Sequence, residues 1–286
     1  MKLTGKNCLV TGANTGLGLA VAKQLAEKGA HTILLCRDKT KGENALNEIK
    51  KITPDASLDL MICDLASMQS IQNFVKVFKE KYTKLDILFN NAAVMKPKRT
   101  TTMDGFEVMF QVNYLAPFIL MNAFIELLKN SSSPFIINIA RPEYKVRLNM
   151  DNLQFSKKYG MWNSFFVTKL YLLLAALEFS RRRENEGITV SMIDPGERPF
   201  KSELVRDFPI VGWFKNLFSV PVEEAAGYIL DHITSDQVED KNGKIFRGRN
   251  EWPLSEYWKD KTISRNLWAA TESLIDSKKI SKNNYG

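Results

Sequence analysis

The chain has 286 residues, of which 44% are hydrophobic and 25% are charged, and its net charge at neutral pH is +8. This composition is ordinary for a soluble globular protein and excludes disordered, fibrous and collagen-like classes, while the length suits a single α/β domain. The basic residues are scattered, and we interpret the densest clusters as solvated faces and not as a nucleic-acid site: Arg181–Arg183, Lys278, Lys279 and Lys282.

Short apolar runs alternate along the chain with longer stretches of helical periodicity. Strands are predicted near residues 7–12, 32–36, 58–62, 85–89, 134–139, 188–193 and 243–246. Such alternation is typical of a parallel sheet that is covered by helices on both faces. We therefore expect an α/β fold with a single doubly wound sheet of about seven strands.

The first strand continues into a glycine turn and then into a helix, in the segment LVTGANTGLG at residues 9–18. Gly12 permits the tight turn, Gly16 lets the backbone approach a pyrophosphate, and Gly18 allows the helix to pack closely on the strand. The helix N–H groups then face the phosphates. A glycine pattern alone is weak evidence, but the strand–turn–helix context predicts a Rossmann-type nucleotide site.

The second strand ends in TILLCRD, with Cys36 followed by Arg37. In NAD-binding folds of this type an acidic residue here binds the 2′-hydroxyl of the adenosine ribose. A carboxylate would repel a 2′-phosphate, whereas a guanidinium binds it through charge-assisted hydrogen bonds of about 1.5–3 kcal/mol each. The sequence therefore favours NADP(H), with a plain surface charge as the alternative role of Arg37.

Two connections are longer than βα units need, at about 140–161 and about 195–220. Long excursions after the carboxyl ends of strands are where open α/β sheets bind ligands. The second connection contains FPIVGWFKNLF, which is either an apolar lid over a substrate or a short helix packed on the domain. Both interpretations stay open.

Between these connections, residues 163–180 form a helix that is apolar on most of its circumference. Such a helix must be buried on more than one side. One side is expected to pack on the sheet, and the other to meet either a second subunit or a covering helix of the same chain. We expect a homo-oligomer, most simply a dimer, built around this helix and the segment at about 104–129.

The three cysteines, Cys8, Cys36 and Cys63, lie in or beside predicted strands without CxxC spacing or a nearby histidine. They are expected to be small core residues in a reducing compartment, and no metal site is expected. The first residues enter a strand almost at once, which leaves no room for a signal peptide, and no apolar run has the length of a membrane span. We expect a cytoplasmic protein, with peripheral contact to an anionic membrane left open.

Eight short motifs carry a more specific signal: TGANTGLG at 11–18, CRD at 36–38, CDLAS at 63–67, NNAAV at 90–94, VNYLAPF at 112–118, DNLQF at 151–155, TKL at 168–170 and DPG at 194–196. With them, the sequence resembles the short-chain dehydrogenase/reductase family, in particular its retinol-dehydrogenase-like branch, from about residue 5 to 250. The resemblance implies an NADP-binding domain over residues 1–250, with residues 251–286 as a C-terminal extension packed on it. The cofactor contacts predicted by the turn and the resemblance together are Gly12, Asn14, Thr15, Gly16, Leu17, Gly18, Arg37, Asp64, Leu65, Asn91, Ala92, Lys169, Pro195 and Gly196.

Catalysis in this family uses an Asn, a Ser, a Tyr and a Lys. The Tyr is the general acid, and the Lys four residues later on the same helix lowers the pKa of the Tyr and holds the ribose. Asn113 and Lys169 match this pattern. Phe165 stands at the Tyr position, and the segment NIAR puts Ala140 and Arg141 where the family has its Ser.

Loss of both hydroxyls predicts an NADP(H)-binding protein without the ordinary oxidoreductase turnover, such as a sensor or regulatory partner. The alternative is an NADPH-dependent oxidoreductase of carbonyl or retinoid-type substrates, a class of apolar small molecules, with Tyr144 and Arg141 in rearranged catalytic roles. A third possibility is an interaction protein that keeps the fold alone. His31 and His232 are expected to be structural, at a strand start and on a surface-like helix.

Overall fold

In the computed structural model, residues 2–139, 148–195, 221–235 and 239–283 are described. They form one eight-stranded sheet in the order β3-β2-β1-β4-β5-β6-β7-β8. The strands are β1 (Asn7–Thr11), β2 (His31–Cys36), β3 (Leu58–Ile62), β4 (Ile87–Asn90), β5 (Phe135–Ile139), β6 (Thr189–Asp194), β7 (Lys244–Arg247) and β8 (Asn250–Glu251). The first seven run parallel, which confirms the predicted doubly wound fold.

The eighth strand is the one element of the sheet that the sequence pattern missed. It is two residues long and pairs antiparallel with β7, with Phe246 opposite Glu251. Apolar alternation cannot be recognised in two residues, and both are exposed.

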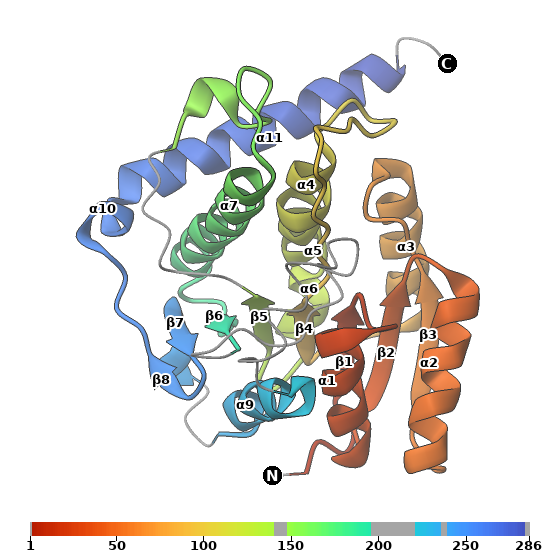
Figure 1. The fold of residues 1–286 in the computed structure, drawn as a ribbon. Coiled ribbons are helices and arrows are strands. Elements are labelled where there is room, and N and C mark those ends of the chain that lie inside the picture. Colours follow the sequence, from red (N-terminus) through yellow and green to blue (C-terminus); the bar gives the residue numbers. More distant parts are fainter. Residues whose placement is uncertain (1, 140–147, 196–220, 236–238, 284–286) are drawn as a thin grey trace.

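Helices cover both faces of the sheet (Figure 1). One face packs against α1 (Gly16–Glu27), α2 (Lys39–Ile52) and α9 (Val222–Thr234). The other packs against α3 (Met68–Lys81), α4 (Val108–Phe110), the π-helix η1 (Gln111–Leu115), α5 (Ala116–Ala123), α6 (Ile125–Lys129) and α7 (Met161–Arg182). The strand order changes direction between β1 and β4, and the carboxyl ends of strands at such a point are where open α/β sheets bind ligands.

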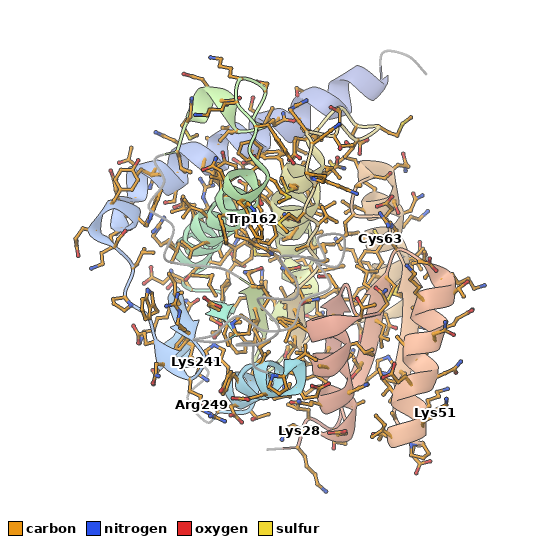
Figure 2. The ribbon with its side chains drawn as sticks, viewed as in Figure 1. Lys28, Lys51, Cys63, Trp162, Lys241 and Arg249 are labelled. Atoms are coloured by element: carbon orange, nitrogen blue, oxygen red, sulfur yellow. The ribbon has the colours of Figure 1, made fainter. Side chains whose placement is uncertain are left out.

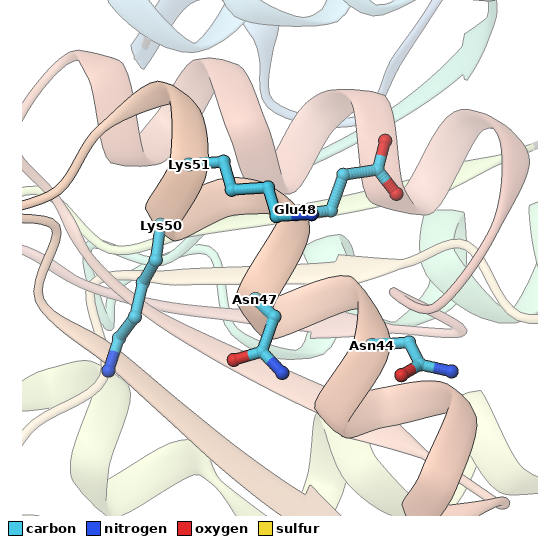
Figure 3. Close-up of a pocket in the computed structure, with 5 residues that line it drawn as sticks. All are labelled: Asn44, Asn47, Glu48, Lys50 and Lys51. Atoms are coloured by element: carbon cyan, nitrogen blue, oxygen red, sulfur yellow. The ribbon is translucent and has the colours of Figure 1, made fainter.

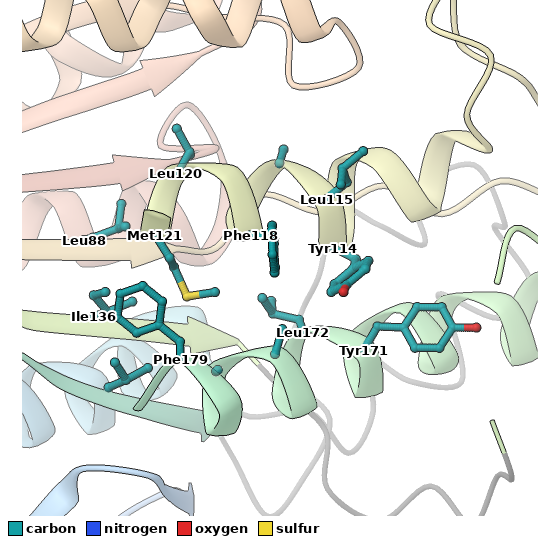
Figure 4. Close-up of a cluster of buried hydrophobic side chains, with 14 of the residues drawn as sticks. Leu88, Tyr114, Leu115, Phe118, Leu120, Met121, Ile136, Tyr171, Leu172 and Phe179 are labelled. Carbon is teal, nitrogen blue, oxygen red and sulfur yellow. The ribbon is translucent and has the colours of Figure 1, made fainter. Parts of the chain in front are cut away.

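The last part of the chain forms α10 (Glu256–Lys259) and the long helix α11 (Lys261–Asn283), which packs on α7. Trp268 of α11 is buried, and its ring centroid lies 4.6 Å from that of Phe118 on α5. The hydroxyls of Tyr114 and Thr271 share a 2.5 Å hydrogen bond between η1 and α11. Figure 4 shows Tyr114 and Phe118 in the buried cluster that faces α7.

The apolar side of α7 is therefore covered by a helix of the same chain, which was one of the two alternatives from the sequence. The homo-oligomer stays a prediction, but α7 no longer supports it, because this helix does not need a second subunit to cover its apolar side.

Two of the arginines at the end of α7 also have a structural role that the sequence did not suggest, because they hold the buried carboxylate of Glu178. Arg181 and Arg182 bond to Glu178 at 2.7 and 2.9 Å. The Arg182 guanidinium lies 4.7 Å from the centroid of the Trp268 ring. Burial raises the pKa of Glu178, but its bonds to the two arginines outweigh burial, so the net shift is downward. Arg182 is exposed, as expected of a solvated face, and Arg181 is half-buried, while both also join α7 to α11.

The three cysteines are buried free thiols, as predicted. Both histidines have structural partners. His31 Nε2 lies 3.0 Å from Asp59, while His232 is buried, and its Nε2 lies 2.9 Å from the Ser191 hydroxyl. Burial and then the charge of Lys241 lower the pKa of His232 to about 3, so it is neutral. The expected surface-like environment of His232 was wrong, since this face of α9 packs on the sheet.

No helix in the described residues is both long enough and apolar enough to span a membrane. Within the same ranges, no group of acidic, histidine or cysteine side chains has the arrangement of a metal site.

Candidate functional site

The glycine turn after β1 has the backbone that the sequence predicts. Gly12 and Gly16 have φ angles of +66° and +54°, a region that other residues rarely adopt. A Cβ atom on Gly18 would collide with the carbonyl oxygen of Gly12 and lie 2.5 Å from Nδ2 of Asn91. The turn therefore requires glycine at Gly12 and Gly16 for conformation and at Gly18 for space.

Helix α1 begins at this turn with free backbone donors. The side chain of Thr15 at the N-cap makes no capping hydrogen bond, and no acidic residue lies in the first turn. Asn14 is half-buried, Thr15 is exposed, and Leu17 packs into the core. Unsatisfied N–H groups at a helix N-terminus bind anions, which fits a pyrophosphate.

At the end of β2, burial raises the pKa of the Cys36 thiol to about 11, so this position carries no negative charge. Arg37 and Lys41 are exposed, and no ion pair of Arg37 occurs within the described residues. The carboxylate of Asp38 caps α2 by accepting a hydrogen bond from the Lys41 backbone N–H at 3.0 Å. The two side chains that extend freely from this corner are therefore cationic.

Beyond β3, Asp64 is half-buried and Leu65 is buried. The Asp64 carboxylate accepts a hydrogen bond from the Ala66 backbone N–H at 2.9 Å, and its own N–H donates to the Ser70 hydroxyl at 2.9 Å. These contacts give Asp64 a role in the turn, and among the described residues its second carboxylate oxygen accepts no hydrogen bond.

The ends of β1 and β4 are joined through Thr11, which sequence reasoning did not single out. Its hydroxyl oxygen accepts hydrogen bonds from the backbone N–H groups of Asn91 and Ala92, both at 3.0 Å. Asn91 Nδ2 donates to the Thr11 carbonyl at 2.9 Å. Thr11 is the first residue of the TGANTGLG motif, so a polar residue that ends a buried strand was the available signal.

A second unforeseen contact lies beneath the site. Asn90 Nδ2 donates to Asn138 Oδ1 at 2.9 Å, with both side chains buried, and the bond ties the ends of β4 and β5. Such buried amides on adjacent strands fix the strand ends from which the site loops leave.

Asn113 is buried in η1, where the π-helical turn points its amide at the loop after β4. Its Oδ1 accepts from the Val94 N–H at 2.7 Å, and its Nδ2 donates to the Val94 carbonyl at 2.9 Å. Nδ2 also lies 3.2 Å from the hydroxyl of Thr168, next to Lys169. Asn113 therefore holds this loop against α7, which makes it a positioning residue.

Lys169 is the most unusual group of the site. Its side chain is buried, and Nζ has no hydrogen-bond partner among the described residues. Burial lowers the pKa of this ammonium to about 8. An unpaired buried cation is costly, so this side chain fits a ligand that supplies oxygen acceptors, such as the hydroxyls of a ribose.

One turn before Lys169, half-buried Phe165 occupies the helix position that the sequence analysis assigned to the missing Tyr. Its ring centroid lies 5.6 Å from that of Phe166, which in turn stacks with Trp162 at 6.3 Å. Trp162, labelled in Figure 2, is also half-buried. This part of the site is apolar.

At the end of β6, Pro195 is buried. The predicted site residues Gly196, Arg141 and Tyr144 lie outside the described residues, as does Ala140. Apart from Pro195, the long connection at about 195–220 also lies outside the described residues.

A surface hollow elsewhere is lined, among the residues that the structure describes, by five residues of α2: Asn44, Asn47, Glu48, Lys50 and Lys51 (Figure 3). Glu48 pairs there with Lys23 of α1 at 2.6 Å. None of the residues that line this hollow belongs to the predicted site.

Comparison with known proteins agrees with this arrangement. Residues 6–150 match the short chain dehydrogenase family. Over 284 residues the chain is 34% identical to retinol dehydrogenase 13 of Homo sapiens, covering 96% of this chain and 85% of that protein. It is also 34% identical to retinol dehydrogenase 11 of Mus musculus over 279 residues, covering 96% and 88%.

Solved structures share the fold. An uncharacterised protein from Mycobacterium paratuberculosis superposes with a TM-score of 0.76 at 24% identity, covering 96% of this chain and 94% of that one. A metagenomic short-chain oxidoreductase in complex with NADP has a TM-score of 0.65 at 22% identity, covering 86% and 98%. On the family match and the identity to its relatives, this chain belongs to the short-chain dehydrogenase family, whose oxidoreductases bind nicotinamide cofactors.

Proposed function

We propose that this chain binds NADP(H) and does not carry out the usual carbonyl reduction of its family, and that it acts instead as a sensor or regulatory partner. The observation that carries the proposal is a pair of residues on α7: a buried Lys169 with no hydrogen-bond partner in the described parts of the chain and, one turn earlier, Phe165 in place of a proton donor. The residues that would bind the cofactor are kept, and the residue that would donate a proton to the substrate is missing.

The cofactor would be held by the ends of β1, β2 and β4. The turn that begins at Gly12 and the first N–H groups of α1 would bind the pyrophosphate, and Lys169 Nζ would donate to ribose hydroxyls. When bound, the nicotinamide supplies a hydride donor or acceptor. The fit is supported by the buried ammonium without a partner and by the absence of space for a Cβ at Gly18.

The preference for NADP(H) over NAD(H) is proposed from the charges at the end of β2. Arg37 is exposed, and the neighbouring carboxylate of Asp38 caps α2. A guanidinium that approaches a 2′-phosphate gains charge-assisted hydrogen bonds of about 1.5–3 kcal/mol each, and NAD(H) offers no such group.

The loss of ordinary turnover is proposed from the missing hydroxyls. The Phe165 ring has no proton to give, and removal of a positioned donor costs about 10²–10⁴ in rate. Arg141 at the Ser position removes a further hydroxyl that would bond to the substrate oxygen. Asn113 and Lys169 alone cannot protonate a carbonyl in the way that a tyrosine does.

Titration calorimetry with each cofactor tests the binding part. NADPH should bind tighter than NADH, and Arg37→Asp should abolish the difference. Lys50→Asp on the same α2 region is the matched control, since Lys50 is exposed at the far end of the helix. Equal affinities in the unmodified protein would refute the preference, and no binding of either cofactor would favour an interaction protein that keeps the fold alone.

Turnover with NADPH over a panel of reactive carbonyls and retinoids tests the chemical part. The expected result is no detectable consumption of NADPH by the unmodified protein. Brisk turnover would refute the pseudoenzyme proposal.

A second candidate is favoured by the identity to retinol dehydrogenases, which extends over 96% of this chain. In this alternative the protein is an NADPH-dependent oxidoreductase of carbonyl or retinoid-type substrates, with Tyr144 or Arg141 in place of the lost donor. Turnover that is abolished by Tyr144→Phe would support it.

The contacts of α11 also support a proposed division of the chain. Residues 1–250 would form the cofactor-binding domain, and residues 251–286 an extension packed on it. The buried ring of Trp268 against α5 and the bond between Thr271 and Tyr114 are the contacts on which this division rests.

A further inference from the structure

Two surface loops lie side by side beyond the candidate site. One follows β4 through Lys96 and Arg99, and the other precedes α7. Tyr159 donates a hydrogen bond to the Lys96 carbonyl at 2.5 Å, and Arg99 Nε donates to the Gln154 carbonyl at 3.1 Å. Figure 1 shows both loops near α11, at the end of the molecule opposite the N-terminus.

These loops expose five cationic side chains, which we call the cationic rim: Lys96, Lys98, Arg99, Lys157 and Lys158. Among the described residues, none of the five is in an ion pair. Among the described acids of these loops, buried Glu107 feels the charge of Arg99, and its carboxylate accepts a hydrogen bond from the Phe110 N–H at 2.7 Å. Asp104 is half-buried and accepts from the Met68 N–H at 2.6 Å and from the Gln111 side chain at 2.8 Å. Within the described part of the two loops, Asp151 is the one exposed acid.

Beside the rim stands the most exposed apolar side chain of the described residues. Met103 is 100% exposed. It lies on a short hairpin that is closed by a bridge between Thr101 and Glu107 and turns at Gly105, with a φ of +79°. Arg99 is attached to the same hairpin, because its guanidinium bonds to the Thr101 hydroxyl at 3.3 Å. The hairpin therefore presents an apolar tip next to fixed positive charges.

Exposed cations without ion pairs among the described residues, on two adjoining loops next to a projecting apolar side chain, match the chemistry of an anionic lipid surface. The charges meet the headgroups, and the apolar tip enters the boundary with the acyl chains. A nucleic acid is less well matched, because the exposed residues of the rim include no aromatic ring on which a base could stack.

We propose that the cationic rim docks this protein on membranes that contain anionic phospholipids, with Met103 inserted. The rim begins two residues beyond Val94, whose backbone is bonded to Asn113. Docking would therefore turn the candidate site toward the lipid surface. The proposal does not depend on whether the site turns over.

Co-sedimentation with vesicles tests the proposal. The protein should bind vesicles of phosphatidylcholine mixed with phosphatidylserine, and should not bind phosphatidylcholine alone, at about 0.1 M salt, where charges are screened beyond about 10 Å. Each cation near the surface contributes about fivefold to binding, so reversal of three charges should weaken it by about 100-fold or more. The variant is Lys98→Glu with Lys157→Glu and Lys158→Glu, none of which lies in the cofactor machinery.

The matched control reverses three exposed lysines at the other end of the molecule: Lys2→Glu, Lys50→Glu and Lys51→Glu. Figure 2 labels Lys51 there. Both variants have the same net charge, so the difference isolates the position of the charges. Equal losses in the two variants would overturn the proposal, as would equal binding to neutral vesicles.

An environment-sensitive dye tests insertion. The native cysteines are all buried, so Met103→Cys can be labelled selectively, with Ile52→Cys at the end of α2 as the control. The dye at position 103 should shift to shorter wavelength on anionic vesicles, and the dye at position 52 should not. A dye at 103 that stays in water on bound vesicles would refute insertion, and binding of RNA or acidic peptides without vesicle binding would refute the choice of partner.

Discussion

Replacing Lys169 by methionine removes a buried ammonium group and keeps most of the volume of the side chain. Burial lowers the pKa of Lys169 from an ordinary value of 10.5 to about 8. One pKa unit corresponds to about 1.4 kcal/mol, so the charged lysine destabilises the ligand-free fold by about 3 kcal/mol at neutral pH. The Lys169→Met variant should therefore be more stable than the natural protein by about that amount.

The sign of the pH dependence follows from the same shift. Between about pH 8 and 10.5 the unfolded chain keeps the proton of Lys169 while the folded chain loses it. Stability then rises with pH, since the unfolded state binds more protons. The penalty is complete below about pH 8 and vanishes above about pH 10.5. Other titrating groups are common to both proteins and cancel in the difference.

Urea unfolding of both proteins from pH 7 to pH 10.5 provides the measurement. The stability gap should be largest at pH 7 and should shrink toward the constant packing difference between lysine and methionine. A gap that stays the same across this range would refute the buried, unpartnered ammonium. As an independent check, Lys169→Met should weaken NADPH binding, because it removes a donor to the ribose.

The double variant Phe165→Tyr with Arg141→Ser restores the missing hydroxyls and should recover some NADPH-dependent reduction of a reactive carbonyl. Neither change alone should do as much, because such residues act as a unit. A double variant that binds NADPH but stays inert would show that the substrate cleft has changed too. Gly18→Ala should abolish NADPH binding by calorimetry and cost about 1–3 kcal/mol, because the new methyl group meets the carbonyl of Gly12; retained affinity would contradict the close packing of the turn. Trp268→Ala should cost about 3–5 kcal/mol in urea unfolding, since this ring of α11 is buried against Phe118 of α5 and Phe179 of α7; a loss under 1 kcal/mol would mean that α11 is only loosely attached.

The order of strands and helices could be predicted because each buried strand is a short apolar run between stretches of helical period. The seven parallel strands all appear within a few residues of their expected positions. The strand Asn250–Glu251 could not be predicted, because its pairing depends on β7 and not on its own side chains. The π-helical turn at Asn113 could not be predicted either, because the local sequence pattern of this segment does not distinguish it from an ordinary helix.

The candidate site could be predicted at positions where the backbone conformation or the space available allows one residue type. Gly12 and Gly18 stand where only glycine fits, so the motif itself carried the information. The partners of a side chain were not predictable. The bond between Asn113 and Val94, and the lack of a partner for Lys169 within the described ranges, follow from packing between segments far apart in the sequence.

The position of α11 has a consequence for biosynthesis. Helix α7 ends at Arg182 and α11 begins at Lys261, so about 80 residues must still be added before the cover can form. At synthesis rates of about 5–20 residues per second, the apolar side of α7 stays uncovered for roughly 4–16 s. During that interval the nascent chain exposes the surface that packs around Phe118 and Tyr114. Final packing of α7 therefore has to wait until α11 has been made, and a chain released before α11 would be a substrate for chaperones.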